Sequence, residues 1–292
     1  MKARVRDACA KVNLTLRVLR KRADGYHDID SLIVFVNLAD RLEWNSQANA
    51  AGFALQLSGD FIDNTPAGEK NLVIQAARLF MQQYEVSLSG HVRLEKYIPI
   101  AAGLGGGSSD AAAMLDALGE GIVHEELEVL ASELGADVPV CLRAQKGMRA
   151  CVIRGRGEDI RVFNNLPQIS LLLAKPPGML SAGEVYRCWD KLDGNEKNIS
   201  DDTNPGSMTL GDLISWCRVR ENNLEKAAIS LLPEIQNVLD ALEESHDCLF
   251  SRMSGSGPTC FGIYENFDAV ERARVALARA YPDWWLYATT TR

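Results

Sequence analysis

Residues 99–114 read PIAAGLGGGSSDAAAM, and this stretch organises the interpretation of the whole chain. Four glycines between positions 103 and 107 leave the backbone free to adopt positive φ and to approach a ligand closely. The sequence from Ala111 to Leu118 favours a helix, and the Ser-Ser-Asp at 108–110 offers good N-caps, so we expect the helix to begin there. A helix N-terminus that follows a glycine loop presents free N–H groups and a partial positive charge, which predicts a phosphate-binding site.

Two familiar glycine motifs do not match this loop. A dinucleotide fingerprint, GxGxxG, that starts at Gly103 needs a third glycine at position 108, where the chain has serine. A P-loop ends in GK[ST], and residues 99–114 contain no lysine. A glycine-rich turn that only caps a core helix is the alternative without a ligand.

The composition is that of a soluble globular protein with room for two domains: 292 residues, of which 47% are apolar and 24% charged. A formal net charge of −8 argues against nucleic acid or a membrane surface as partners, because both require basic patches. Seven cysteines without a CxxC pair favour reduced thiols over a zinc site or a disulfide framework. The charged N-terminus is followed by no apolar signal region and no long apolar run occurs, so we expect a cytoplasmic chain.

The N-terminal segment combines an expected strand with a polar turn. Alternation over residues 12–18 predicts a strand on which Lys11 and Asn13 share a face, although Lys11 by itself could be a solvated lysine at a strand end. The turn sequence DGYH at 24–27 leads into a second expected strand at 31–38. This turn carries two amphipathic rings, which favours a functional role for the nearby lysine.

The middle of the chain contains a second acidic candidate, Asp137. It lies in the sequence GADVP after an expected helix at 124–134 that Gly135 ends. By local physics its carboxylate could bond a neighbouring backbone N–H group in a turn before Pro139. Before the glycine loop we expect a helix over 72–84 and a strand over 91–96.

The second half of the chain alternates strands and helices in the manner of a ferredoxin-like α+β domain. It follows a hairpin at 147–163, which turns at 154–158, and a boundary at 164–167. The sequence predicts strands at 169–174, 248–253, 259–264 and 284–289, helices at 182–189, 209–218, 224–244 with a break at Pro233, and 268–281, a polar surface loop at 192–207 and a second glycine loop at 254–258.

The pattern PxxxGLGGGSSDAA at 99–112 resembles the nucleotide loop of the GHMP small-molecule kinases. AKVNL at 10–14, RADGYH at 22–27 and GADVP at 135–139 agree with one member of that family. The resemblance implies an α+β fold with two domains, one like domain 2 of ribosomal protein S5 at 1–164 and a ferredoxin-like one at 165–292. It also implies ATP-dependent phosphorylation of an alcohol that carries a cytidine diphosphate group, in the non-mevalonate route to isoprenoid precursors.

The resemblance implies a role for each residue that matches a family motif. Asp137 would be the general base and Lys11 its assistant. The ATP-binding residues would be Pro99, Ala101, Ala102, Gly103, Leu104, Gly105, Gly106, Gly107, Ser108, Ser109, Asn71, Leu72 and Lys96. The substrate-binding residues would be Asn13, Tyr26, His27, Tyr186, Gly255, Ser256 and Gly257, with the two tyrosines stacked on the cytosine, the histidine at its edge and the second glycine loop closing on the phosphates.

Two positions depart from the family pattern, Ala182 before the aromatic and Asn223 in Asn222-Asn223-Leu224-Glu225. The second lacks a carboxylate, so no protein ligand for a metal is assigned, and Mg²⁺ is expected through the ATP phosphates and water. Two alternatives remain: a GHMP kinase for homoserine or a mevalonate derivative, and a non-catalytic nucleotide-binding protein. The expected partner is the small-molecule substrate, with no nucleic acid and no membrane, and the chain is expected to be a monomer or weak homodimer.

Overall fold

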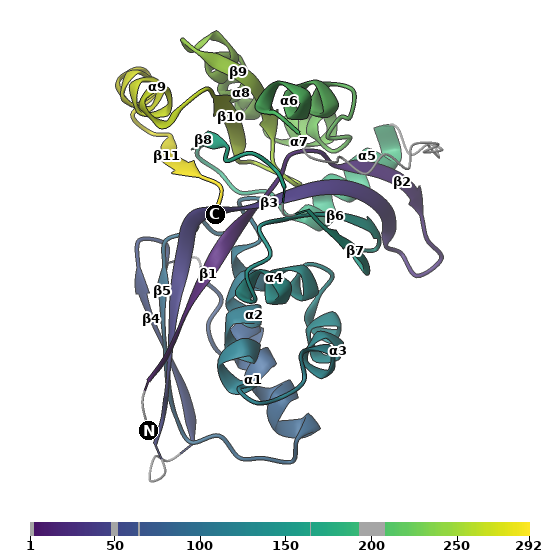
Figure 1. The fold of residues 1–292 in the computed structure, drawn as a ribbon, viewed down its shortest axis with the longest axis vertical. Helices are drawn as coiled ribbons and strands as arrows, with labels where there is room; N and C mark the ends of the chain where they lie inside the picture. The colour runs from purple at the N-terminus through teal and green to yellow at the C-terminus, as the bar shows by residue number, and fades with distance from the viewer. Residues whose placement is uncertain (1–2, 48–51, 64, 164, 193–207) are drawn as a thin grey trace. The chain divides into compact units, whose positions relative to one another are not determined.

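The structure is a computed structural model that describes residues 3–47, 52–63, 65–163, 165–192 and 208–292 (Figure 1). By its internal contacts the chain divides into two compact units. Unit 1 consists of residues 1–11, 38–100 and 105–148, and unit 2 consists of residues 12–37, 101–104 and 149–292. Most of the expected loop at 192–207 lies outside the described residues.

Unit 1 combines strands with a layer of helices built around one buried helix, α2 (Gly106–Leu118). Every residue of α2 from Ser109 to Leu118 is buried, because this helix packs against α1, α3 and α4. Figure 1 shows these helices together on one side of the strands. The elements are β1 (Arg4–Asn13), the second part of β3 (His27–Ser46), β4 (Phe53–Gly59), the short η1 (Gly68–Lys70), α1 (Leu72–Gln83), β5 (Gly90–Lys96), α2, α3 (His124–Leu134) and α4 (Val138–Gln145).

In unit 1, β5 lies between β4 and β3 in the sheet. This strand pairs antiparallel with the second part of β3, from Arg41 to Ser46, and parallel with β4. Val92 and Leu94 on β5 and Leu42 on β3 are fully buried, as alternation along a sheet with one covered face predicts. The end of β5 delivers the chain at Lys96 to the segment that precedes the glycine loop.

Unit 2 contains a four-stranded antiparallel sheet in the order β11-β8-β10-β9. In chain order this is 4-1-3-2, the arrangement of a ferredoxin-like domain, and α8 and α9 pack on its strands. Its core includes Leu172, Val238, Tyr264 and Val270. The elements are β8 (Ser170–Lys175), α5 (Ala182–Leu192), α6 (Leu210–Arg218), α7 (Glu225–Leu231), α8 (Glu234–Glu244), β9 (Cys248–Met253), β10 (Cys260–Tyr264), α9 (Phe267–Ala280) and β11 (Trp285–Thr290).

The rest of unit 2 is a group of antiparallel strands around the first part of β3. β2 (Arg17–Lys21) and β6 (Ala150–Gly155) both pair with this part of β3, and β7 (Asp159–Val162) pairs with β6. Strand β3 therefore contributes to both units, so the units do not follow a cut at residue 164. The predicted division into 1–164 and 165–292 stays a prediction about domains.

Several predicted elements are wrong in extent. The strand expected at 12–18 is two strands, β1 and β2, because Leu14 and Leu16 instead donate backbone hydrogen bonds to Leu32 and Glu221. Helix α2 begins at Gly106 rather than at 108–110, since Gly105 is its N-cap and both following glycines take helical geometry. Strand β4 and helix α4 were not predicted, and β3 extends well beyond 31–38. The other expected helices and strands are present with bounds shifted by a few residues.

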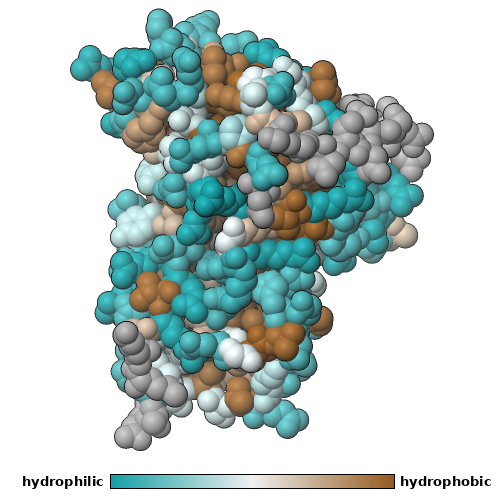
Figure 2. Space-filling view, in the orientation of Figure 1, coloured by the Kyte–Doolittle hydropathy of each residue, from teal (hydrophilic) through white to brown (hydrophobic). Residues whose placement is uncertain are grey.

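The face of the molecule drawn in Figure 2 is mainly hydrophilic. Figure 2 shows hydrophobic residues in separate patches on the face in view. Among the described residues, no helix is both long and apolar enough to span a membrane. None of the seven cysteines, which all lie in the described ranges, forms a disulfide bond.

Candidate active site

The N-terminus of α2 retains the features that predict a phosphate site. Gly105 is its N-cap at φ 68°, a left-handed conformation that favours glycine, and no side chain caps the helix. The first N–H groups of a helix have no partner within it, so those of the first turn remain available to a ligand. Gly107 is exposed and Ser108 half-buried at this end. Ser109 differs, because its hydroxyl donates a hydrogen bond to the Cys9 carbonyl at 2.7 Å and faces the interior.

Lys11 and Asp137 form an ion pair beside this helix terminus. Lys11 Nζ lies 3.2 Å from Asp137 Oδ2, and the lysine side chain is buried whereas the carboxylate is 38% exposed. A Cβ atom on Gly105 would lie 2.8 Å from Lys11 Cγ and 2.9 Å from its Cε. The lysine therefore runs directly along the N-cap of α2, and glycine at position 105 leaves room for it.

Asp137 does not serve as a simple turn residue. It occupies the N-cap position of α4, with Pro139 in the first turn, yet its side chain makes no capping hydrogen bond. Its carboxylate instead faces Lys11, and part of it remains accessible to solvent. Nearby, burial and the charge of Asp137 raise the pKa of Cys141 to about 12, so this thiol stays protonated and is a poor nucleophile.

The predicted adenine-side residues divide into one accessible and two buried side chains. Leu72 is half-buried, and its Cδ1 atom would lie 3.5 Å from a Cβ on Gly107. Asn71 is buried and caps α1: its Oδ1 accepts from the Val73 N–H at 2.9 Å while its Nδ2 donates to the Pro66 carbonyl. Lys96 is 1% exposed. An adenine contact for any of the three stays a prediction.

Lys96 is held between two buried carboxylates. Its Nζ donates to Asp40 Oδ2 and, at 2.5 Å, to Asp110 Oδ2. Burial alone would lower the pKa of Lys96, but the charges of Asp110 and Asp40 outweigh it and raise that pKa. Sequence reasoning did not find the pairing of either aspartate with Lys96, because the aspartates lie on β3 and α2, apart from the lysine in the chain.

In unit 2 the second glycine loop packs against the first part of the glycine-rich stretch. Ser254 Oγ donates to the Gly103 carbonyl at 3.0 Å and accepts from the Asn13 N–H at 3.1 Å. A Cβ atom on Gly103, which has φ 73°, would lie 2.4 Å from the Ser254 carbonyl oxygen, so only glycine fits there. The two glycine-rich segments thus meet within unit 2, and the contact of the second loop with phosphates stays a prediction. Ser256 is half-buried in the same loop.

The segment Asn222 to Glu225 supports this second loop. Asn222 Nδ2 donates to the carbonyls of Met253 and Gly255, each at 2.8 Å. Glu225 Oε2 accepts from the Met253 N–H at 3.0 Å, and burial raises its pKa. Both side chains therefore hold the backbone of the loop, a role that sequence reasoning did not find.

An aromatic and polar cluster surrounds His27 on β3. The imidazole stacks on Tyr186 with ring centroids 4.9 Å apart and meets Trp189 edge-on at 5.6 Å. His27 Nε2 lies 2.7 Å from Asp190 Oδ1, and Lys21 Nζ lies 2.5 Å from Asp190 Oδ2. Burial alone would raise the pKa of Asp190, but Lys21 and His27 outweigh it and lower it. The spacing of four residues from Tyr186 to Asp190 on one helix could have revealed the aspartate.

Tyr26 is more exposed than the other predicted substrate-binding residues. Its side chain is exposed, and the Arg156 guanidinium lies 4.6 Å from the ring centroid. One ring face is therefore occupied by a cation, as in a cation–π contact. Asn13, by contrast, is buried and donates through Nδ2 to Ser31 Oγ at 2.8 Å. The substrate contacts predicted for Tyr26 and Asn13 remain predictions.

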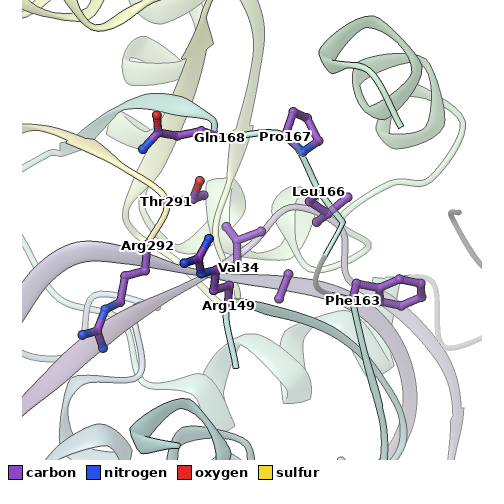
Figure 3. A pocket seen from close by; sticks show the side chains of 9 residues that line it. Val34, Arg149, Phe163, Leu166, Pro167, Gln168, Thr291 and Arg292 are labelled. Carbon is purple, nitrogen blue, oxygen red and sulfur yellow. The ribbon is translucent and has the colours of Figure 1, made fainter. Parts of the chain in front are cut away.

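The cavity drawn in Figure 3 does not coincide with the predicted site residues, and the described residues form no metal centre. Within the described ranges, no group of three or more His, Cys, Asp or Glu residues is arranged to hold a metal ion. A cavity of about 380 Å³ lies in unit 2, with Arg292 and Phe163 on opposite sides (Figure 3). Its lining contains no residue that the sequence predicted for the site: Val34, Arg149, Ala150, Phe163, Leu166, Pro167, Gln168, Thr291 and Arg292.

Comparison with known proteins shows which family the chain resembles. Residues 71–145 match the family model for the GHMP kinases N terminal domain, and residues 207–283 match the model for GHMP kinases C terminal. The 4-diphosphocytidyl-2-C-methyl-D-erythritol kinase of Parvibaculum lavamentivorans is 41% identical over 285 residues, which cover 96% of this chain and 95% of the relative. The chain belongs to the GHMP kinase family.

Further relatives and solved structures agree with this assignment. The kinase of the same name from Bradyrhizobium sp. is 38% identical over 96% of this chain and 94% of its own length. A crystal structure of 4-(cytidine 5'-diphospho)-2C-methyl-D-erythritol kinase matches with a TM-score of 0.74 and 34% identity, covering 99% of this chain and all of the other. The mevalonate kinase of L. major, at 15% identity and a TM-score of 0.73, shows the shared GHMP fold alone. The predicted family and fold class are confirmed.

Proposed function

We propose that this GHMP kinase transfers the γ-phosphoryl group of ATP to the 2-hydroxyl group of 4-diphosphocytidyl-2-C-methyl-D-erythritol. The products are the 2-phosphate and ADP, in the non-mevalonate route to isoprenoid precursors. The observation that carries this proposal is the Lys11–Asp137 ion pair beside Gly105, the N-cap of α2. Relatives with this activity in their names, similar over nearly the whole chain, support the choice of substrate.

The residues of unit 1 suit the needs of phosphoryl transfer. Such a transfer requires a phosphate cradle, charge neutralisation and a carboxylate that accepts the hydroxyl proton. The first turn of α2 would hold the β- and γ-phosphates on its free N–H groups. Asp137 would accept the proton at Oδ1 or Oδ2, and Lys11 would keep this carboxylate ionised and oriented.

Mg²⁺ would bind mainly through the ATP phosphates and water. Near the helix terminus Ser108 is half-buried, the Ser109 hydroxyl is committed to Cys9, and the partly exposed Asp137 carboxylate is paired with Lys11. This donor set suits a cation that keeps most of its ligands from phosphate and water. When bound, the ion would neutralise charge on the transferring phosphoryl group.

The aromatic residues of unit 2 suit recognition of a pyrimidine. Tyr26 and Tyr186 offer ring faces for stacking, and His27, with Nε2 held by Asp190, offers its other ring nitrogen to the edge of a base. Asn13 and the loop Gly255, Ser256 and Gly257 are proposed as further substrate contacts. Stacking tolerates many bases, so the edge contact would provide the selectivity for cytosine.

The test is to incubate the protein with Mg²⁺, ATP and a panel of alcohols and to follow the products by phosphorus NMR. The panel contains 4-diphosphocytidyl-2-C-methyl-D-erythritol, its uridine analogue, homoserine and mevalonate. We expect a new phosphomonoester at the 2-position of the cytidyl compound and slower turnover of the uridine analogue. A phosphate on a different alcohol would overturn the substrate assignment, and ATP binding without turnover of any alcohol would favour a non-catalytic nucleotide-binding protein.

A further inference from the structure

The buried cluster of Lys96, Asp40 and Asp110 lies at the base of the glycine-rich helix. Asp40 is fully buried on β3, Lys96 is the last residue of β5, and Asp110 is the fifth residue of α2. A buried ammonium or carboxylate is costly unless it is paired and hydrogen-bonded. The cluster meets this requirement through direct contacts between the three side chains.

Asp40 fixes the backbone that leads from β5 toward the glycine loop. Its Oδ1 accepts hydrogen bonds from the N–H groups of Tyr97 at 2.6 Å and Ile98 at 2.8 Å, and its Oδ2 accepts from Lys96. Ile98 in turn lies against α2, because its Cγ2 atom would be 3.1 Å from a Cβ on Gly106. Asp40 therefore holds the segment against which the first turn of α2 packs.

Lys96 joins this anchored segment to α2 itself. Its Nζ contacts Asp110 Oδ2 at 2.5 Å, one turn beyond the helix start. No side chain caps α2 at Gly105, so the usual restraint on a helix terminus is missing here. Ser109, bonded to the Cys9 carbonyl, and Asp110, bonded to Lys96, restrain the first turns instead.

We propose that Lys96 is a positioning residue that acts on the nucleotide through Asp110 and α2, rather than by touching adenine. This inference rests on the proposed role of α2 in ATP binding. With 1% of its surface exposed and its Nζ between two carboxylates, Lys96 has no accessible donor for a base. Its effect is to set where the free N–H groups of the first turn point.

The experiment compares ligands that use the helix with a ligand that does not. For Lys96→Met and for wild type we measure the dissociation constant of ATP. The inhibition constants of inorganic tripolyphosphate and of adenosine are measured with each as a competitor of ATP. Because misplacing a binding group by a fraction of an ångström weakens every ligand held by it, we expect the constants for ATP and tripolyphosphate to rise by the same factor, about tenfold or more. The constant for adenosine and the KM of the alcohol substrate stay unchanged.

A matched control separates positioning from general loss of stability. Asp116 lies on the same helix, is as buried as Asp110, and pairs with Arg6 and with Lys146 at 2.6 Å. Asp116→Asn also removes a buried charge from α2, but nearly three turns beyond the phosphate end. We expect both variants to melt at a lower temperature and only Lys96→Met to lose phosphate affinity.

Asp110→Ala provides a second test if Lys96→Met fails to fold. It breaks the link to α2 while the Lys96–Asp40 pair remains, so no unpaired charge is buried, and the same common rise for ATP and tripolyphosphate is expected. If the constants for ATP and adenosine rise while the constant for tripolyphosphate stays unchanged, Lys96 contacts adenine and the inference is overturned. Unchanged constants, or a wild-type protein that tripolyphosphate does not inhibit, would overturn it as well. Since the binding of ATP, tripolyphosphate and adenosine is measured without the cytidyl substrate, an error in the proposed alcohol would leave these three results intact.

Discussion

Lys11 Nζ lies 3.2 Å from Asp137 Oδ2, and the shaft of the same lysine lies against Gly105 at the start of α2. One side chain thus connects the candidate general base with the candidate phosphate site. A lysine in this position can do two things at once: keep the carboxylate ionised and contribute positive charge where the phosphoryl group is transferred.

The pair predicts non-additive losses of activity. Asp137→Asn keeps the shape and removes the base, so kcat should fall by roughly 10²–10⁴ while ATP affinity changes little. Lys11→Met should also lower kcat. Because the lysine acts in part through the carboxylate, the double variant should lose much less than the product of the single losses. Turnover and melting temperature of all three variants check this, and a destabilised but fully active Asp137→Asn protein would remove the proposed base.

Gly105→Ala tests the contact between the helix terminus and Lys11. A Cβ at this position would collide with the lysine and sit on a backbone with φ 68°, so we expect lower stability together with a reduced kcat. Gly121→Ala is the control, because Gly121 has φ 89° and a Cβ added there would meet no described atom within 4 Å beyond its own chain neighbours. This control should lose stability by strain alone. Equal kcat values for the two variants would contradict a role for the Gly105 contact.

The aromatic side chains of unit 2 predict a change in KM rather than in kcat. Tyr26→Ala and Tyr186→Ala should each raise the KM of the cytidyl substrate by about five- to 150-fold, because base stacking contributes about 1–3 kcal/mol. Stacking on a ring remote from the reaction is similar in ground and transition states, so kcat should change less. Tyr281→Ala serves as the control, since Tyr281 stacks on Trp284 instead. Losses confined to kcat would contradict a cytosine platform.

The raised pKa of Asp110 predicts that this residue makes the free energy of unfolding depend on pH. Burial, reinforced by the charge of Asp40 and opposed by Lys96, raises its pKa from the ordinary 3.8 to about 8. Between these values Asp110 binds a proton in the folded protein but not in the unfolded chain, so its own contribution to the unfolding free energy falls as pH rises from about 4 to about 8 and then levels off. Cys141, which also lies near Asp110, has a pKa of about 12 and stays neutral in this range.

Asp110→Asn should remove that contribution. Chemical denaturation of the variant and of wild type at several pH values gives a difference curve in which the carboxylates that do not interact with Asp110 cancel. We expect the variant to gain stability relative to wild type as pH rises through this range. A flat difference curve would show that Asp110 titrates near its ordinary value.

Sequence reasoning succeeded where the signal is local. The glycine loop, the helix after it, the helix expected at 72–84 and the hairpin turn at 154–158 each depend on residues a few positions apart, whose turn and helix preferences can be read directly. The predicted start of α2 was wrong because Ser109 and Asp110 look like caps in sequence. In the structure their side chains instead form hydrogen bonds with Cys9 and Lys96 inside unit 1. The strand expected at 12–18 failed because residues 8–16 are all buried, so alternation in polarity there does not report exposure.

By itself the sequence determined the family, the ferredoxin-like order of elements in the second half and the identity of the candidate base, because motifs of fixed spacing specify loops that bind phosphate. Only the tertiary structure decided how the side chains are used. Lys96 meets Asp40 across 56 residues of sequence and His27 meets Asp190 across 163. Pairings of this range follow from the packing of strands and helices, and burial then forces charged groups to find partners that no local pattern announces.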